Sequence, residues 1–360
     1  MSNNSLRNTK KNIKIVSINL ILIVAILSFV EGLSSILLMF YRISKIQRNP
    51  AHLYAQYDEF LGWVNIPDVN IPNMYGEGIY FRTNSQSLRN NQDFTINIPP
   101  NKVRIICSGD SFTMGLGVSN DQTWCQLLTS INQRLETINM GQGGYGVDQV
   151  YLWYKRDGTK FEHNIQIFAF ITDDFVRMQS ANFFGYGKPL LSLENGDLVN
   201  HNFPVPRGGF LFQKIREGSR YIQELRFLGL WQILFPRKLE TDNQYVAQTP
   251  AIAMKIFEEL AEINREKNSK LVVVYLPIRS DYYGKESDFW RQYLQVELEK
   301  RNIIYIDLIA EFRNIMPQEK VETVFLGGDG HYSVFGNEFF ANVLYEKLLS
   351  LPEVRVILQQ

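Results

Sequence analysis

Histidine and cysteine are scarce in this chain, which has four of the former and two of the latter in 360 residues. Two cysteines exclude a framework of several disulfides, and they form no Cys-x-x-Cys pair of the kind found in zinc or redox sites. No second histidine lies at metal-ligand spacing from His331, so we expect no metal. No glycine-rich loop ends in Gly-Lys-Ser/Thr, which argues against a phosphate-binding loop. We therefore expect neither a metal ion nor a cofactor.

The chain also lacks a charge excess, because 37 basic side chains balance 37 acidic ones. Proteins that wrap nucleic acid need a basic excess to neutralise phosphates, so we expect no nucleic acid as a partner. The neutral total combines two unlike parts. Residues 1–48 hold seven basic side chains and one acidic, which leaves 30 basic and 36 acidic for the remainder. With 45% apolar residues, the chain can bury a large core, which excludes global disorder.

One long apolar run stands at the N-terminus, from Ile15 to Tyr41. A helix of about 20 such residues crosses the hydrocarbon core of a membrane. The run exceeds the ~7–15 apolar residues of a secretory signal peptide, and no Ala-x-Ala cleavage site follows it. An uncleaved signal-anchor is therefore favoured over a signal peptide or a buried core helix. Four basic residues precede the run and three follow it, which weakly favours a cytoplasmic N-terminus and an extracytoplasmic remainder.

Beyond this anchor, assigned to residues 1–48, the chain divides into two further parts. Residues 49–100 contain five prolines among short aromatic stretches, which predicts an extended segment that packs on the core. Residues 101–350 alternate between short β-branched runs and amphipathic stretches, as in a parallel sheet covered by helices. The expected strands are 103–108, 137–140, 165–172, 271–276 and 303–307. The expected helices are 123–134, 147–155, 251–268, 289–301 and 333–349.

This alternation predicts an α/β fold, a three-layer α/β/α sandwich around a five-stranded parallel sheet of the flavodoxin-like kind. The pattern lapses between residues 175 and 248, which we assign to an inserted cap. Within the cap, Asn195-Gly196 separates two apolar segments and predicts a hairpin. Aromatic residues of the cap are expected either to line a substrate site or to pack the cap itself: Phe183, Phe184, Tyr186, Phe210, Phe212 and Trp231.

Ligands of such folds bind at the carboxyl ends of the strands, so candidate chemistry is sought there. The first strand is followed by Gly109-Asp110-Ser111. A serine at a tight strand-to-helix turn is exposed, and the unpaired N–H groups of the helix can receive developing negative charge. Taken alone, the tripeptide favours a plain helix-capping serine in a glycine-rich turn over a nucleophile.

Two further segments follow later strands. The second strand leads into a glycine-rich turn that contains Gly144, which either offers an N–H to the cleft or is a simple flexible turn. Beyond the fifth strand comes Asp329-Gly330-His331. Histidine is the usual general base near neutral pH, and a nearby carboxylate can orient its ring. The other three histidines lack such a neighbour, so His331 is the candidate base.

Together, these segments resemble the SGNH (GDSL-type) hydrolase superfamily of esterases, lipases and carbohydrate O-acyl esterases and transferases. The likeness covers roughly residues 100–175 and 250–350, and residues 57–63 look like the entry to its membrane-anchored bacterial members. The resemblance implies Ser111 as nucleophile, His331 as general base and Asp329 as its partner. It also implies that the N–H groups of Ser111 and Gly144 form an oxyanion hole.

Two departures from the family pattern affect the expected chemistry. The asparagine that usually donates to the oxyanion corresponds here to Asp173, and an ionised carboxylate cannot donate. Three alternatives follow: Asp173 is protonated and donates, another group donates to the oxyanion in its place, or the catalytic chemistry is impaired. Asp329 stands two residues before His331 instead of the commoner three. That spacing resembles the polysaccharide O-acetyltransferase branch.

The sequence thus predicts a serine esterase that acts on an O-acyl group of cell-surface carbohydrate or lipid. An O-acyltransferase that uses the same residues is the first alternative, and a catalytically weak glycan-binding or scaffold protein is the second. Cys107 ends the first predicted strand and Cys125 opens the following helix. Two packed thiols are the default expectation for them, and pairing stays open.

Overall fold

The computed structural model describes residues 3–44, 53–183, 185–206, 243–327 and 330–359. The chain divides into two compact units, and the described part of the first is the helix α1 (Asn3–Ser44). This helix contains a stretch, Asn12–Leu37, that is long and apolar enough to cross a membrane. Its apolar side chains are largely exposed, as for Ile21 (67%) and Phe29 (71%). A helix over most of the predicted anchor is therefore present, and its insertion in a membrane stays a prediction.

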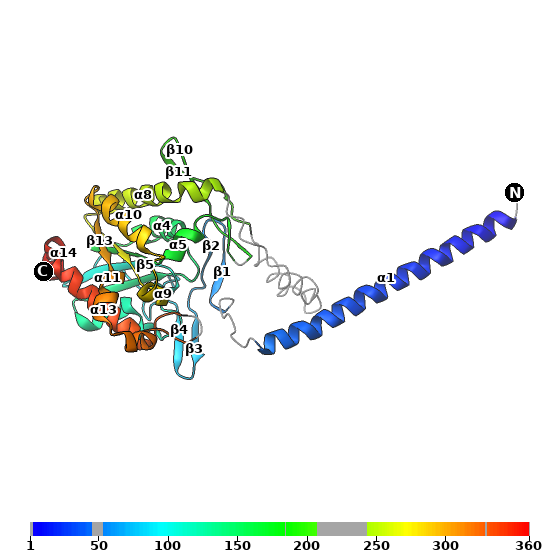
Figure 1. Cartoon of the computed structure of the whole chain (residues 1–360), viewed down its shortest axis with the longest axis horizontal. Coiled ribbons are helices and arrows are strands. Elements are labelled where there is room, and N and C mark those ends of the chain that lie inside the picture. Colours follow the sequence, from blue (N-terminus) through cyan, green and yellow to red (C-terminus); the bar gives the residue numbers. More distant parts are fainter. Residues whose placement is uncertain (1–2, 45–52, 184, 207–242, 328–329, 360) are drawn as a thin grey trace. The chain divides into compact units, whose positions relative to one another are not determined.

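The second unit is built around a five-stranded parallel sheet (Figure 1). Its strands are β5 (Val103–Gly109), β6 (Leu135–Gly141), β7 (Ile165–Phe170), β12 (Lys270–Tyr275) and β13 (Ile304–Asp307). They lie in the order β13-β12-β7-β5-β6, which is the flavodoxin-like arrangement 2-1-3-4-5 in sequence order. The predicted fold class is confirmed. Strands β5 and β7 are buried along their whole length, because helices cover both faces of the sheet.

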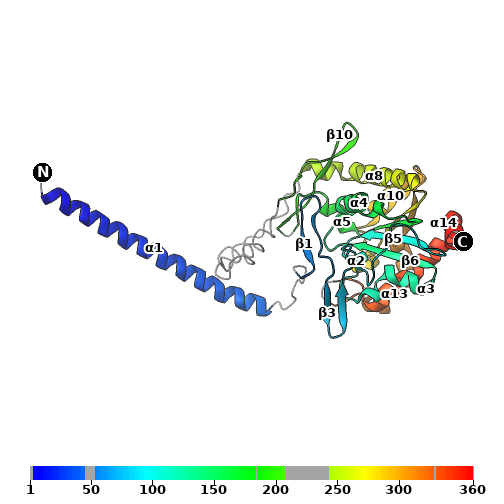
Figure 2. The same cartoon turned by 180° about the vertical axis from the view of Figure 1, so that it is seen from behind.

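Helices form a layer on each face of this sheet, as both views of the chain show (Figures 1 and 2). One layer contains α4 (Val147–Arg156), α8 (Asn243–Glu266) and α10 (Asp288–Glu299). The other contains α3 (Trp124–Ile131) and α13 (Val334–Ser350), which pack on each other. Shorter helices complete the unit: α2 (Ser111–Met114), α5 (Thr172–Arg177), α9 (Arg279–Tyr283), α11 (Leu308–Ile315), α12 (Val321–Val324) and α14 (Pro352–Gln359).

Small antiparallel hairpins lie outside the central sheet. Before it come β1 (Ala55–Asp58) with β2 (Gly62–Asn65), and β3 (Asn70–Gly76) with β4 (Ile79–Arg82). After β7 come β8 (Asn182–Phe183) with β9 (Tyr186–Gly187), and β10 (Leu191–Glu194) with β11 (Asp197–Asn200). The last pair turns at Asn195-Gly196, both with positive φ, so the predicted hairpin is confirmed.

Helix α8 begins earlier than the sequence predicts. The sequence predicts a helix over residues 251–268. In the structure α8 starts at Asn243 and contains Pro250 in its interior. The described part of the cap therefore ends before residue 243, and the helix that follows is longer than expected.

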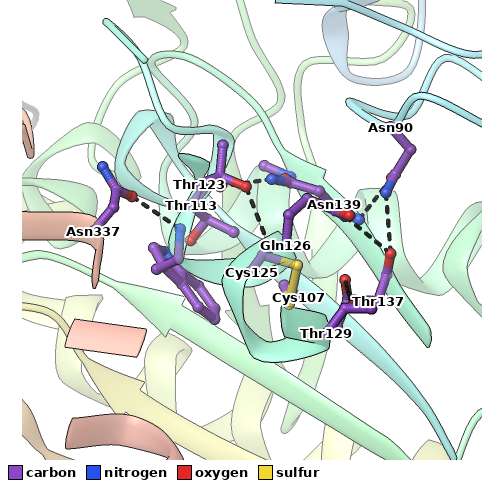
Figure 3. Close-up of a disulfide and its surroundings, with 12 residues drawn as sticks. Asn90, Cys107, Thr113, Thr123, Cys125, Gln126, Thr129, Thr137, Asn139 and Asn337 are labelled. Atoms are coloured by element: carbon purple, nitrogen blue, oxygen red, sulfur yellow. Dashed lines mark hydrogen bonds between the residues drawn. A yellow bond between two sulfur atoms is a disulfide. The ribbon is translucent and has the colours of Figure 1, made fainter. Parts of the chain in front are cut away.

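Cys107, near the carboxyl end of strand β5, forms a disulfide with Cys125, at the start of helix α3 (Figure 3). Their Cα atoms lie 6.2 Å apart, within the range that a disulfide bridges. The default expectation of two packed thiols is therefore wrong. The sequence gives no means to judge this distance, because it depends on how α3 packs on the sheet. The bond closes a loop that contains Ser111.

Candidate active site

Ser111 stands at the first position of α2, directly beyond the carboxyl end of β5. Asp110 caps this helix, and its Oδ1 accepts the N–H of Phe112 at 2.9 Å. Gly109 is required before it, because a Cβ there would lie 2.7 Å from the carbonyl oxygen of Ala169. The N–H of Ser111 donates to no acceptor among the described residues. The turn therefore presents both a hydroxyl and a free N–H at the edge of the sheet.

His331 reaches this turn from the other end of the chain. An isolated bridge between Phe325 and Tyr332 holds the backbone beside it, and Leu326 N donates to His331 O at 2.7 Å. The His331 ring packs on Phe112, with ring centroids 4.7 Å apart. Its Nε2 lies 2.8 Å from Ser111 Oγ. A serine hydroxyl at hydrogen-bond distance from an imidazole is the geometry that general-base activation of a nucleophile needs.

Gly144 lies in the turn that follows β6 and adopts φ +79°, a conformation that favours glycine. Its N–H, like that of Ser111, donates to no acceptor in the described parts of the chain. A Cβ at this position would come within 2.6 Å of the Phe183 ring, so Phe183 covers the glycine. Two strand ends that are adjacent in the sheet thus supply one unpaired N–H each, as the sequence resemblance implies.

The sequence analysis singled out two aspartates besides Asp110, namely Asp173 and Asp329, and the structure describes only Asp173. Asp173 lies in the first turn of α5 and is exposed. Asp174, next to it, is fully buried, and its Oδ2 caps α5 by accepting the N–H of Ile171 at 3.0 Å. Asp329 lies outside the described residues, so its role as the partner of His331 stays a prediction.

A buried ion cluster, made of Asp110, Asp174 and Arg177, lies behind the nucleophile turn. Arg177 Nη1 lies 2.5 Å from Asp174 Oδ1 and 3.2 Å from Asp110 Oδ2. Both carboxylates are 0% exposed, and Arg177 is 15% exposed. Burial and the Asp110 carboxylate raise the pKa of Asp174 well above its ordinary value, while the Arg177 guanidinium acts in the opposite direction. The cluster carries two acidic groups for one basic group.

The far end of α2 is held by two side chains from neighbouring segments. The buried Arg89 donates to the carbonyl oxygens of Met114, Gly115 and Val118, where the helix ends. Asn139 Nδ2, from β6, donates to Thr113 O at 2.9 Å (Figure 3). Carbonyl groups at a helix C-terminus have no partner within the helix, so such donors stabilise it. The position of Ser111 is therefore fixed from both ends of α2.

Aromatic side chains lie beside Gly143 and Gly144. Trp63 Nε1, from β2, donates to Gly143 O at 2.9 Å. Trp63 stacks on Phe183 with ring centroids 6.2 Å apart, and Tyr186 lies 6.1 Å from it. These residues join the N-terminal hairpin to the cap next to the candidate oxyanion donors. The other predicted cap aromatics, Phe184, Phe210, Phe212 and Trp231, lie outside the described residues.

Arg177 and Arg89 are site residues that the sequence analysis did not single out. Arg177 stands four residues after Asp173 and three after Asp174, spacings that bring side chains together on a helix. The sequence alone could therefore have predicted an interaction of Arg177 with these aspartates. Arg89 carries no such pattern, because its partners are backbone carbonyls far along the chain. Within the described ranges, no group of three or more histidine, cysteine or acidic side chains is placed to hold a metal ion.

Comparison with known proteins finds likeness in solved structures. No protein-family model matches the chain, and no curated protein matches its sequence. A member of the lipolytic protein G-D-S-L family from Veillonella parvula is 14% identical, with a TM-score of 0.41 over 69% of this chain and 100% of that one. An acetyl xylan esterase is 13% identical, with a TM-score of 0.42 over 68% and 99%.

A lipase/acylhydrolase from Enterococcus faecalis is 12% identical, with a TM-score of 0.38 over 68% of this chain and 95% of that one. These three proteins are described as a lipolytic G-D-S-L family member, an acetyl xylan esterase and a lipase/acylhydrolase. Each match has a low sequence identity and a TM-score of 0.42 or less. The roles assigned below to Ser111 and His331 therefore depend on the geometry of the site itself.

Proposed function

We propose that this protein is a serine esterase that works through an acyl-enzyme on Ser111. His331 Nε2 accepts the hydroxyl proton as Ser111 Oγ forms a bond to the ester carbonyl carbon. The N–H groups of Ser111 and Gly144 receive the oxyanion. The proton then passes from His331 to the leaving alcohol as its C–O bond breaks. Water repeats the sequence and releases the acid, with Asp329 proposed to orient the His331 ring.

The observation that carries the proposal is the 2.8 Å approach of His331 Nε2 to Ser111 Oγ. A serine that only caps a helix needs no histidine beside it, and a histidine that only packs in the core needs no serine hydroxyl at its Nε2. The pair also stands beside two N–H groups without acceptors, on the turns after β5 and β6. Nucleophile, base and oxyanion donors together are what acyl transfer requires.

For the substrate we propose an O-acyl group of a cell-surface carbohydrate or lipid. The Trp63, Phe183 and Tyr186 cluster, in which Phe183 and Tyr186 are partly exposed, supports this, because aromatic rings bind sugar faces and acyl chains. In an O-acyltransferase, a sugar hydroxyl would replace water in the second step. The Asp-x-His spacing at Asp329 and His331 favours that alternative. The two differ only in the group that accepts the acyl.

We propose that α1 is an uncleaved anchor and that the second unit lies outside the cytoplasm. The Cys107–Cys125 disulfide supports this location, because such bonds persist in oxidising compartments and are rare in the cytosol. The weak excess of basic residues before the apolar run agrees with it. This location is tested by treating membranes that contain the protein with a maleimide, before and after reduction of the disulfide, and counting the thiols of Cys107 and Cys125 that react. Two thiols that react only after reduction support the location, and thiols that react without it contradict it.

Labelling with a fluorophosphonate probe separates an enzyme from a binding protein. The full chain in detergent is expected to react at Ser111, and Ser111→Ala is expected to lose the label. Ser180→Ala is a matched control, because Ser180 and Ser111 are both 6% exposed. A wild-type chain that takes no label, or a label that survives Ser111→Ala, overturns the esterase and the transferase together. It would leave the glycan-binding scaffold as the remaining function.

Product analysis then separates hydrolysis from transfer. The wild-type chain, not treated with the probe, is supplied with p-nitrophenyl acetate, with and without an added oligosaccharide. Free acetate in both cases is expected of the esterase. An acetylated oligosaccharide that forms at the expense of acetate would identify the transferase.

A further inference from the structure

Arg177 connects the two turns that carry the candidate oxyanion donors. Its Nη1 lies 3.2 Å from Asp110 Oδ2 and 3.1 Å from Tyr145 O. Asp110 immediately precedes Ser111, and Tyr145 immediately follows Gly144. A single nitrogen atom of α5 therefore touches the neighbour of each donor, although the two donors follow different strands, β5 and β6.

The guanidinium is also held in orientation. Asp174 Oδ1 lies 2.5 Å from the same nitrogen, and the Arg177 Cζ lies 5.4 Å from the centre of the Phe183 ring. Phe183 covers Gly144, so the arginine is confined between buried carboxylates and the ring over the oxyanion glycine. A planar group with fixed donors is better suited to such a bridge than a flexible ammonium.

The positive charge of Arg177 also offsets the negative charge of neighbouring carboxylates. Asp110 and Asp174 are both 0% exposed, and Asp173 stands four residues before Arg177 on the same short helix. The buried Asp110 and Asp174 carboxylates thus lie behind a turn at which negative charge develops in the proposed reaction. Arg177 is the cation that offsets them in this cluster.

We propose that Arg177 is a positioning residue of the oxyanion hole, which fixes the spacing between the Ser111 and Gly144 N–H groups and offsets the carboxylates behind them. This inference rests on the proposed esterase function. Arg177 acts through Asp110 and the Tyr145 carbonyl, and no contact with substrate is required of it. Its loss is expected to weaken binding of the transition state more than binding of the substrate.

The test uses the full chain in detergent with p-nitrophenyl acetate as substrate. Arg177→Met, which keeps length and removes charge, is expected to lower kcat by about 10²-fold with a change in KM below about threefold. Arg177→Lys restores the charge and is expected to recover about tenfold of that loss. Arg291→Met is the matched control, because Arg291 is 18% exposed and also bridges two carboxylates, Asp288 and Asp307.

A trifluoromethyl ketone distinguishes positioning from a general structural role. It forms a tetrahedral oxyanion on the serine, so its inhibition constant is expected to rise in Arg177→Met in parallel with the fall in kcat/KM. Unchanged kcat and inhibition constant in Arg177→Met, with an active wild type, overturn the proposal. If Arg177→Met does not fold, Arg177→Lys is measured in its place. An inhibition constant of the ketone for Arg177→Lys equal to that for the wild type would also overturn the proposal. An inactive, unlabelled wild type would instead overturn the proposed function.

Discussion

Ser111 and His331 meet through a 2.8 Å contact between Oγ and Nε2, although 220 residues separate them in the sequence. Because the two groups act as one unit, Ser111→Ala and His331→Ala are each expected to lower kcat/KM by about 10³-fold or more. The double variant is expected to be no worse than either single one. Hydrolysis of p-nitrophenyl acetate measures this, with thermal melting to verify folding. Losses that multiply in the double variant would mean that the residues act independently.

Asp173→Asn tests whether the unusual carboxylate has a function of its own. Asparagine donates a hydrogen bond that an ionised carboxylate cannot, and Asp173 is exposed, so its replacement leaves no buried group unpaired. We expect esterase activity that is unchanged or higher, by at most about 10²-fold. Asp197→Asn, at an exposed position in the cap hairpin, is the control. A large loss of activity would show that the carboxylate takes part in the reaction.

His163 is expected to make the fold sensitive to acid. Burial lowers its pKa to about 4 in the folded chain, and its ring nitrogens bond to Tyr154 Oη and Phe161 O. The folded state therefore binds a proton less readily than the unfolded state, whose histidine titrates near 6.5. The stabilisation is full above that pH and is lost as pH falls toward 4. The loss amounts to about 3 kcal/mol.

The measurement for His163 is the free energy of unfolding between pH 7 and pH 4. His163→Gln is expected to lower stability at pH 7 and to flatten the dependence on pH across this window. His201→Gln serves as the comparison, because His201 is 40% exposed. Equal slopes in wild type and His163→Gln would rule out His163 as the source.

Lys188 and Asp148 form an ion pair between the cap and α4, with 2.5 Å between Nζ and Oδ2 and no exposure of either side chain. Lys188→Met leaves a buried carboxylate without its cation, and we expect it to lower the free energy of unfolding by about 3–5 kcal/mol. The double variant with Asp148→Leu is expected to recover most of this loss. Denaturant titration of the three variants measures it. A double variant as unstable as Lys188→Met alone would mean that packing, not charge, sets the cost.

The strands of the sheet were largely predictable, because β5, β7 and β12 are mostly buried runs rich in apolar side chains. The sequence predicts 103–108 and the structure has Val103–Gly109; it predicts 303–307 and the structure has Ile304–Asp307. The cap hairpin was predictable from Asn195-Gly196. Helix α11 was not, since it starts at Leu308 directly after β13 and is capped by the Asp307 carboxylate, which leaves no loop to mark it.

The site was predictable only where a short segment carries the pattern. Ser111 and His331 stand in such segments, and the structure brings them together as the resemblance implies. The contact of Arg177 with Asp110 and the disulfide depend on packing between elements, because each joins residues that are far apart in the sequence. Asp329 lies outside the described residues and stays a prediction.

The place of His331 beside the N-cap of α13 has a consequence for the timing of activity during synthesis. Chains emerge from the ribosome at about 5–20 residues per second, so the 220 residues between Ser111 and His331 take roughly 10 to 45 seconds. Throughout that interval β5, α2 and β6 can form with the nucleophile turn but without its base. The candidate hydrolase therefore stays without general-base activation until nearly the whole second unit has been made.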